Sequence, residues 1–543
     1  MNLKTMNGNI KALFQNRKFF RLIFILFLAV YLSVGISVFQ DYNVSVDEPI
    51  QREHSRVAYK YINDKLFHRE IDSMMNVDDL PEYAFKYYGV TMQLPLVFVE
   101  DFLHFDLSVR RIFQGRHLYN FLVCVAGYIC FYFALKKIFG NRWYALAGMV
   151  LISLYPRFFA YQFYDIKNLI FAALNMAALL TLVNVVEKCN FLNILLFAFV
   201  TALTTNQRIM GVLFPVLLIG YFIVTDITQA RIAHQEHTDE TRQSAFGWKK
   251  YPLIIFLYLL AWFVITPAAW EEPVRTFYET FVGFSHYERW DGTMLFNGRL
   301  VTCEERPWYY LFAWFGISIP VWYLVLFAAG HVYAVVSVWK SENKWIDILG
   351  KYKWLTCSLA LFWGAVGAVV ILNSRIYEEW RHMYFVFVPF CCIAVYGLVF
   401  LLQKINRKVI YGIAAVCLIL QVVWLVRNHP YQAVYFNGVG RNIATKFDRD
   451  SWYMSNLEML KWIADNDDGE QITVDGYFIE MAELVMDDRD AGRILHTQDD
   501  AKYIIANYTR VVGNTLEYEG YEEVYSVWVD KYKIGSVFRK KEM

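Results

Sequence analysis

The stretch Val44-Ser45-Val46-Asp47-Glu48-Pro49-Ile50-Gln51-Arg52-Glu53-His54 follows the first long apolar run of the chain, residues 19–39. Two adjacent carboxylates, Asp47 and Glu48, therefore stand where a membrane span would emerge into water. Because charge near a bilayer is costly, ionisable groups at this depth are candidates for a functional role. The alternative is that the pair only marks the membrane boundary, with Glu48 and Pro49 beginning a surface helix.

The composition is typical of a membrane protein. The chain has 543 residues, of which 57% are hydrophobic, 18% aromatic and only 19% charged. A soluble domain of this size would carry more charge and fewer aromatic residues. The net charge of +1 gives no indication of a nucleic-acid partner. The 8 cysteines fall almost entirely in apolar runs, so they predict neither a disulfide framework nor a cysteine metal site.

Repeated apolar runs predict an α-helical polytopic membrane protein with about eleven transmembrane helices. The fifth run is short enough to be re-entrant. The expected spans are residues 19–39, 117–133, 143–159, 166–186, 191–205, 209–225, 252–269, 308–338, 355–372, 383–402 and 409–426.

The distribution of Lys and Arg predicts the orientation. These residues gather in the connections that follow every second expected span, on the same side as the N-terminus, which makes that side cytoplasmic. The C-terminus then lies outside. We divide the chain into a membrane domain, residues 1–427, and an extracytoplasmic domain, residues 428–543. The external loops of the membrane domain are expected at residues 40–116, 155–167, 270–307 and 373–382.

The C-terminal part turns polar after the last span. Residues 456–465 have a helical pattern, and residues 471–474, 503–505 and 524–529 have the pattern of strands. These patterns predict a small extracytoplasmic α/β domain. Its sequence contains no catalytic constellation.

Four external clusters carry the groups that chemistry needs. They are Asp47-Glu48 with His54, residues 155–168, residues 284–298 and residues 377–385. Together they offer carboxylates for proton removal, cations for a phosphate and aromatic rings for the face of a sugar.

These clusters resemble the motifs of the GT-C glycosyltransferases, in particular the bacterial branch related to protein O-mannosyltransferases and the lipid A aminoarabinose transferase. That family carries an Asp-Glu pair just after the first span. Its Pro-Arg-Phe-Phe…Asn-x-Lys-Asp, Ser-His-Phe…Gly-x-x-x-Phe-x-Gly and Trp-Arg-His segments resemble residues 156–168, 285–298 and 380–382. Its signatures after the last span resemble residues 429–437 and 450–452. The resemblance covers residues 19 to about 463, and the order of the motifs is more specific than any one of them.

One departure concerns the second motif. Where the family has Asn-x-Lys-Asp, this chain has Asp165-Ile166-Lys167-Asn168, so that the acid and the amide have exchanged places. An acidic residue is kept, and its position is less certain than that of Asp47.

The resemblance implies an inverting transferase of the bacterial inner (plasma) membrane. It would move a sugar from a polyprenyl-phosphate carrier to the hydroxyl of a protein, lipid or glycan acceptor on the periplasmic side. It implies Asp47 as general base, Glu48 as the residue that orients it, and Asp165 as a further catalytic carboxylate. The cations expected at the donor phosphate are Arg157, Lys167, Arg381 and His382, with Arg208 and His286 behind them.

Several alternatives remain open at this level. Arg157 and Lys167 flank a membrane boundary, where such side chains often extend toward the lipid headgroups without any further role. Glu48 with His54 is a possible ligand pair for a divalent metal, although two ligands do not make a site. The competing functions are a transporter or flippase of a lipid-linked sugar, and a polymerase or ligase of surface polysaccharide. A transporter would need polar residues along a path through the bilayer, which the spans lack.

Overall fold

The computed structural model describes residues 16–69, 71, 77–103, 108–236, 247–285, 290–342 and 344–542. Within these residues, 9 helices are long and apolar enough to cross a membrane, and one bent pair of helices raises the number to 10. The chain is therefore a multi-pass helical membrane protein, as predicted. The nine are α2 (Arg17–Val38), α5 (Val109–Phe139), α8 (Asn168–Glu187), α10 (Leu213–Glu236), α11 (Lys250–Ile265), α14 (Val321–Trp339), α16 (Lys353–Ile371), α17 (Phe387–Lys404) and α18 (Arg407–Arg427).

Two of the remaining expected spans are each divided into two helices in the structure. The run at residues 143–159 forms α6 (Arg142–Ser153) and α7 (Pro156–Tyr164), which meet at 66°. The long run at residues 308–338 divides into α13 (Tyr310–Ser318) and α14. In both cases a proline, Pro156 or Pro320, stands at the break, because its ring and its missing N–H end the preceding helix. The short fifth run is the 17-residue helix α9 (Phe191–Gln207).

Most of the segment expected as an external loop, residues 155–167, is helical. Residues 156–164 form α7, and every residue of this helix is buried. Its aromatic side chains pack against α5, the start of α17 and the segment after α18. The expected span ends at residue 159 because glutamine, aspartate and lysine follow it, and hydropathy does not show that protein contacts also cover residues 160–164.

The centre of the bundle is formed by α8 and α17, which are the most deeply buried spans. Helix α8 packs between α5 and α9, and α14 runs along α17. A Cβ atom on Gly397 would lie 1.9 Å from the carbonyl oxygen of Leu326, so only glycine lets α14 and α17 approach this closely. The outer helices α2 and α18 expose leucine, isoleucine and valine side chains, as a lipid-facing surface requires.

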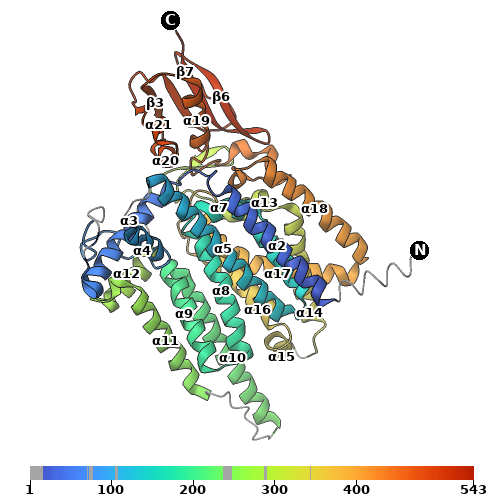
Figure 1. Ribbon diagram of the computed structural model, residues 1–543. Helices are drawn as coiled ribbons and strands as arrows, with labels where there is room; N and C mark the ends of the chain where they lie inside the picture. Colours follow the sequence, from blue (N-terminus) through green and yellow to red (C-terminus); the bar gives the residue numbers. More distant parts are fainter. Residues whose placement is uncertain are drawn as a thin grey trace.

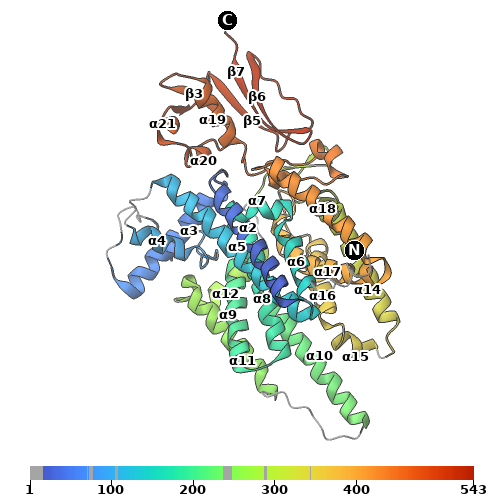
Figure 2. The same ribbon diagram turned by 45° about the vertical axis from the view of Figure 1, so that its right-hand side comes forward.

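Two ends of the bundle differ in character (Figures 1 and 2). The C-terminal sheet and α3 (Asp47–Ile62) lie at one end, and α15 (Lys344–Leu349), the end of α10 and the start of α11 lie at the other. Helix α3 continues into η1 (Asn63–Phe67), and α4 (Leu94–Phe102) packs against it. Helix α12 (Pro273–Ser285) and a hairpin of β1 (Met294–Phe296) and β2 (Arg299–Val301) complete the long connection between α11 and α13.

The C-terminal part forms the small α/β fold that the sequence predicts. Its sheet has the order β4-β3-β5-β7-β6, in which β3 is parallel to β4 and β5, and β7 is antiparallel to β5 and β6. Helix α19 (Asn456–Asn466) precedes the sheet. The strands are β3 (Ile472–Gly476), β4 (Ile494–His496), β5 (Tyr503–Asn507), β6 (Tyr521–Val529) and β7 (Tyr532–Lys540). The sequence did not predict β4, which is very short, or β7, whose buried centre contains glycine and serine.

Residues 428–455 lie between the two parts and attach the sheet to the helices. The side-chain amide of Asn437 donates to the carbonyl oxygens of Gly316 and Ile319, at 2.6 and 2.7 Å. The buried guanidinium of Arg449 donates to the carbonyl oxygens of Val511 and Gly513, at 2.7 and 2.8 Å. These bonds, of which those of Arg449 are charge-assisted, fix the sheet above the end of the bundle.

Candidate active site

Asp47 and Glu48 are the first residues of α3, and their environments differ. Glu48 is fully buried: its Oε2 accepts hydrogen bonds from the backbone N and the Oγ of Ser45, at 2.7 and 3.0 Å. Its Oε1 lies 3.1 Å from Nε2 of His117. Asp47 points outward, with 38% of its side chain exposed. Glu48 therefore holds the turn that presents Asp47. A helix therefore begins at this pair, beyond the end of α2, and the Asp47 carboxylate remains accessible at its start.

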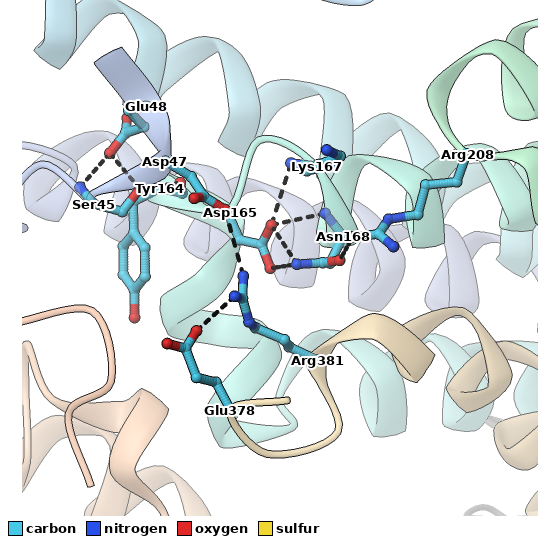
Figure 3. A network of polar contacts seen from close by, with 10 residues as sticks. All are labelled: Ser45, Asp47, Glu48, Tyr164, Asp165, Lys167, Asn168, Arg208, Glu378 and Arg381. Carbon is cyan, nitrogen blue, oxygen red and sulfur yellow. Dashed lines mark hydrogen bonds and ion pairs between the residues drawn. The ribbon is translucent and has the colours of Figure 1, made fainter. Parts of the chain in front are cut away.

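Arg381 is the centre of a polar network beside Asp47 (Figure 3). It is the first residue of the turn η6 (Arg381–Val386), and its guanidinium lies 3.4 Å from the Asp47 carboxylate and 2.5 Å from that of Glu378. The same guanidinium lies over the ring of Trp452, at 4.4 Å from its centroid. Arg381 is buried, so its positive charge is stabilised by these two carboxylates and the indole ring in place of water.

The exchanged acid and amide of the second motif contact each other directly. Asp165 accepts hydrogen bonds from the backbone N of Asn168 at 2.7 Å and from its side-chain amide at 3.0 Å. Arg208, which ends α9, donates to the Oδ1 of Asn168. The exchange therefore leaves both groups at the start of α8. Both carboxylate oxygens of Asp165 are engaged there, so its observed role is to fix the helix terminus.

Lys167 lies in the same connection between α7 and α8. Its ammonium group is 3.9 Å from the centroid of the Tyr88 ring. Burial lowers the pKa of Lys167 to about 7, and the neighbouring cations Arg208 and Arg381 add to this effect. A cation held at so low a pKa beside two other cations marks a place where an anion would be favoured.

The other expected phosphate ligands divide into three cases. His382 follows Arg381 and packs edge-on against the ring of Tyr377, with centroids 4.4 Å apart. Arg157 is not part of the cluster: its fully buried guanidinium forms an ion pair with Glu379 and donates to the carbonyl oxygen of Tyr435 at 3.0 Å. His286 lies outside the described residues.

The backbone next to Arg381 is strained. Glu378 and Glu379 both have positive φ angles, 50° and 70°, which are unusual for residues other than glycine. Glu378 is tied to Arg381, and Glu379 is tied to Arg157, so two ion pairs maintain the conformation. Sequence reasoning assigned no role to Glu378. Its position three residues before Arg381 was the only signal available.

The two possible metal ligands do not come together. Nδ1 of His54 lies 2.6 Å from the hydroxyl of Tyr83, whereas Glu48 is occupied by Ser45 and His117. Nowhere in the part of the chain that the structure describes do three or more His, Cys, Asp or Glu side chains gather as metal ligands would. We therefore derive no step through a metal.

The arrangement joins two chemical capacities at one end of the bundle. Asp47 is a partly exposed carboxylate that can accept a proton, and Arg381, Lys167 and Arg208 are cations that can neutralise a phosphate. Segments that are far apart in the sequence supply these groups: the start of α3, the connection between α7 and α8, the end of α9 and the start of η6.

Comparison with known proteins gives likenesses of structure only. No protein-family model matches the chain, and neither does any curated protein. The chain is similar to ArnT from Cupriavidus metallidurans in the apo state, with 12% identity, a TM-score of 0.47, and coverage of 94% of this chain and 97% of that one.

It is also similar to the Archaeoglobus fulgidus oligosaccharyltransferase tethered with an acceptor peptide containing the NVT sequon, with 11% identity, a TM-score of 0.40, and coverage of 89% of this chain and 69% of that one. Because both TM-scores are low, the function is argued from the site.

Proposed function

We propose that this chain is an integral-membrane glycosyltransferase that moves a sugar from a polyprenyl-phosphate carrier to an acceptor hydroxyl, with inversion. The observation that supports this most is the partly exposed Asp47 carboxylate beside Arg381, with Lys167 and Arg208 in the neighbouring segments. A lipid-linked phosphate reaches an enzyme at the level of the headgroups, and a water-borne acceptor arrives from the adjacent solvent. A site at the end of the bundle meets both requirements.

The reaction needs one displacement. The acceptor oxygen attacks the anomeric carbon and passes its proton to Asp47, while the bond between that carbon and the phosphate oxygen breaks. The electron pair of this bond leaves with the polyprenyl phosphate, whose developing charge is stabilised by Arg381 and Lys167. Attack from the face opposite the leaving group inverts the anomeric centre, and no covalent enzyme intermediate forms.

Glu378 has a defined place in this scheme. Its carboxylate lies 2.5 Å from the guanidinium of Arg381. Burial raises the pKa of the Glu378 carboxyl, which favours its uncharged form when an anionic phosphate arrives. Arg381 is then shared between Asp47 and the phosphate. Glu48 stays with Ser45 and His117 and keeps the first turn of α3 in place.

The pKa of Lys167 predicts a pH dependence for donor use. With a pKa of about 7, Lys167 is charged below that pH and neutral above it. The kcat/KM for the donor should therefore fall as the pH rises through about 7, by about tenfold, the worth of one charge-assisted contact. In Lys167→Arg the side chain stays charged, so this step should disappear from the pH profile. An unchanged step in Lys167→Arg would assign it to another group.

Orientation is tested by labelling. If the end of the bundle that carries the C-terminal sheet is extracytoplasmic, Tyr477→Cys should react with an impermeant maleimide in right-side-out vesicles. Trp248→Cys, next to the connection between α10 and α11, should react only after the membrane is opened. Tyr477 and Trp248 are 78% and 74% exposed, so access is not limited by burial. A version without the native cysteines serves as background, and the reverse pattern would invert the proposed topology.

The function itself is tested by removing the gene. We expect mass spectrometry to show that one glycan is lost from a protein, lipid or polysaccharide fraction, while its polyprenyl-phosphate-linked sugar accumulates. Restoring the wild-type gene should reverse both changes, and restoring the Asp47→Asn variant should reverse neither. Loss of the lipid-linked sugar from the outer leaflet alone would instead support a flippase.

A further inference from the structure

A cavity lies between the helical domain and the C-terminal sheet, apart from the cluster around Arg381. Its volume is about 400 Å³, within the range of small-molecule pockets. It shares no lining residue with the cluster around Arg381. The walls come from the connection after α2, the segment after α18, helix α19 and strand β6. Both parts of the protein are therefore needed to form it.

One wall of this cavity is aromatic. The rings of Trp462 on α19 and Tyr525 on β6 are stacked, with centroids 5.1 Å apart and planes inclined by 14°. Both side chains are half-buried and line the cavity, and the buried Leu457 lines it as well. Flat rings of this kind offer an apolar surface at little cost in conformational entropy.

The other lining residues include three acids, Asp41, Glu458 and Asp465, beside polar side chains and the apolar Pro430 and Met454. The Glu458 carboxylate accepts hydrogen bonds from the hydroxyls of Tyr431 and Tyr525, at 2.5 and 2.6 Å, and this joins the two parts of the protein at the cavity. Asp41 pairs with His429 at 2.8 Å on the side of the helices. Asp465 is exposed at the cavity and has no ion pair to any residue that the structure describes.

We propose that this cavity is a carbohydrate-binding site for a neutral saccharide. A pyranose ring presents C–H groups on a face, which match the Trp462 and Tyr525 rings, and hydroxyl groups at its edge, which match the carboxylates of Asp465 and Asp41. With Glu458 the lining carries three carboxylates against Lys461 and His429, and this balance disfavours a phosphate or an acidic sugar. The inference is separate from the transferase proposal, since it uses none of the same residues.

The test uses the full-length protein in phosphatidylcholine nanodiscs, which contain no sugar headgroups. Saturation-transfer NMR is recorded with mannotriose, chitotriose and maltotriose, and with trigalacturonic acid as the anionic comparison. We expect at least one neutral trisaccharide to bind and the anionic one not to bind. Trp462→Ala should weaken that binding about tenfold. Asp465→Asn should weaken it severalfold, and this exposed position keeps the test valid if Trp462→Ala fails to fold.

Trp339→Ala is the matched control. This tryptophan is the last residue of α14, is 80% exposed and does not line the cavity. Its binding should equal that of the wild type. Trp462→Ala should still release polyprenyl phosphate from the donor, so a failure here is distinguishable from a failure of the transferase proposal. The inference is overturned if no neutral trisaccharide binds, if trigalacturonic acid binds equally well, or if binding persists unchanged in Asp465→Asn and in folded Trp462→Ala.

Discussion

Asp47→Asn should bind the lipid-linked donor and transfer almost none of it. Asparagine keeps the size of aspartate and can still interact with Arg381, but it cannot take the proton of the acceptor. Loss of a general base typically lowers the rate about 10²–10⁴-fold, or about 3–5 kcal/mol of barrier. Because 38% of the Asp47 side chain is exposed, we expect expression and insertion to be normal. Single-turnover transfer by the purified variant, beside a donor-binding measurement, checks this.

Two other variants sharpen the result. Asp79→Asn changes a carboxylate in the same long connection that is 69% exposed and pairs with Lys60, so its transfer rate should be that of the wild type. Glu48→Gln can still accept the hydrogen bonds from Ser45, so its loss should be smaller than that of Asp47→Asn. Normal chemistry in Asp47→Asn would remove the mechanism, and a collapse of its expression would favour a purely structural role.

Arg381→Ala should lose transfer by about 10²–10³-fold, the typical effect of removing one donor aimed at the charge of the leaving group. It should also weaken donor binding, because Arg381 is proposed to contact the phosphate in the ground state as well. Arg381→Lys should recover part of the activity, since lysine keeps the charge but not the planar fork. The measurement is kcat and KM for the donor in each variant, with thermal unfolding recorded in parallel.

The appropriate control for Arg381 is Arg375, which pairs with Glu304 at 2.7 Å on the same side of the protein and lies outside the cluster. Arg375→Ala should leave donor kinetics unchanged. Removal of Arg381 leaves the Asp47 and Glu378 carboxylates without their shared cation, so some loss of stability is expected. A loss of transfer that follows only the loss of folded protein, with normal turnover by the remainder, would contradict the assignment.

Much of the membrane domain was predictable because a span is a local property. Twenty apolar residues are needed to cross the hydrocarbon, so a run of that length is visible without knowledge of tertiary contacts. Where contacts decide, the prediction failed. Helix α7 contains Arg157 and Gln162, which lower its mean hydropathy, yet protein covers every one of its residues. Pro156 stands at the break where α7 turns by 66° from α6. The sequence does contain that proline, and it is the signal that should have divided the run.

The candidate site was predictable as a set of clusters but not as an arrangement. The sequence contained Asp47, Lys167, Arg208 and Arg381, and nothing in their spacing shows that Arg381 lies between Asp47 and Glu378. Arg157 shows the opposite case. It stands in a family-like motif and was expected at the phosphate, but its charge is neutralised by Glu379 inside the protein. Long-range pairing of this kind has no signal in a single sequence.

The acid–amide exchange at residues 165–168 could be interpreted only from the structure. From the sequence, one turn of helix separates the two positions, so the exchange put the acid in doubt. The contact between Asp165 and Asn168 removes that doubt about location, because both groups meet at the start of α8. Whether Asp165 takes part in chemistry stays a prediction, and its engaged oxygens favour a positioning role.

The most direct measurement is the release of polyprenyl phosphate from a polyprenyl-phosphate-linked sugar by the purified protein in detergent micelles, with an envelope extract as the source of acceptor. Micelles have no second compartment, so transport cannot contribute to the signal. The transferase proposal predicts release by the wild type, with one sugar transferred per carrier, and no release by Asp47→Asn. An intact donor in the micelles, together with movement of the lipid-linked sugar across vesicles that contain the same protein, would contradict it.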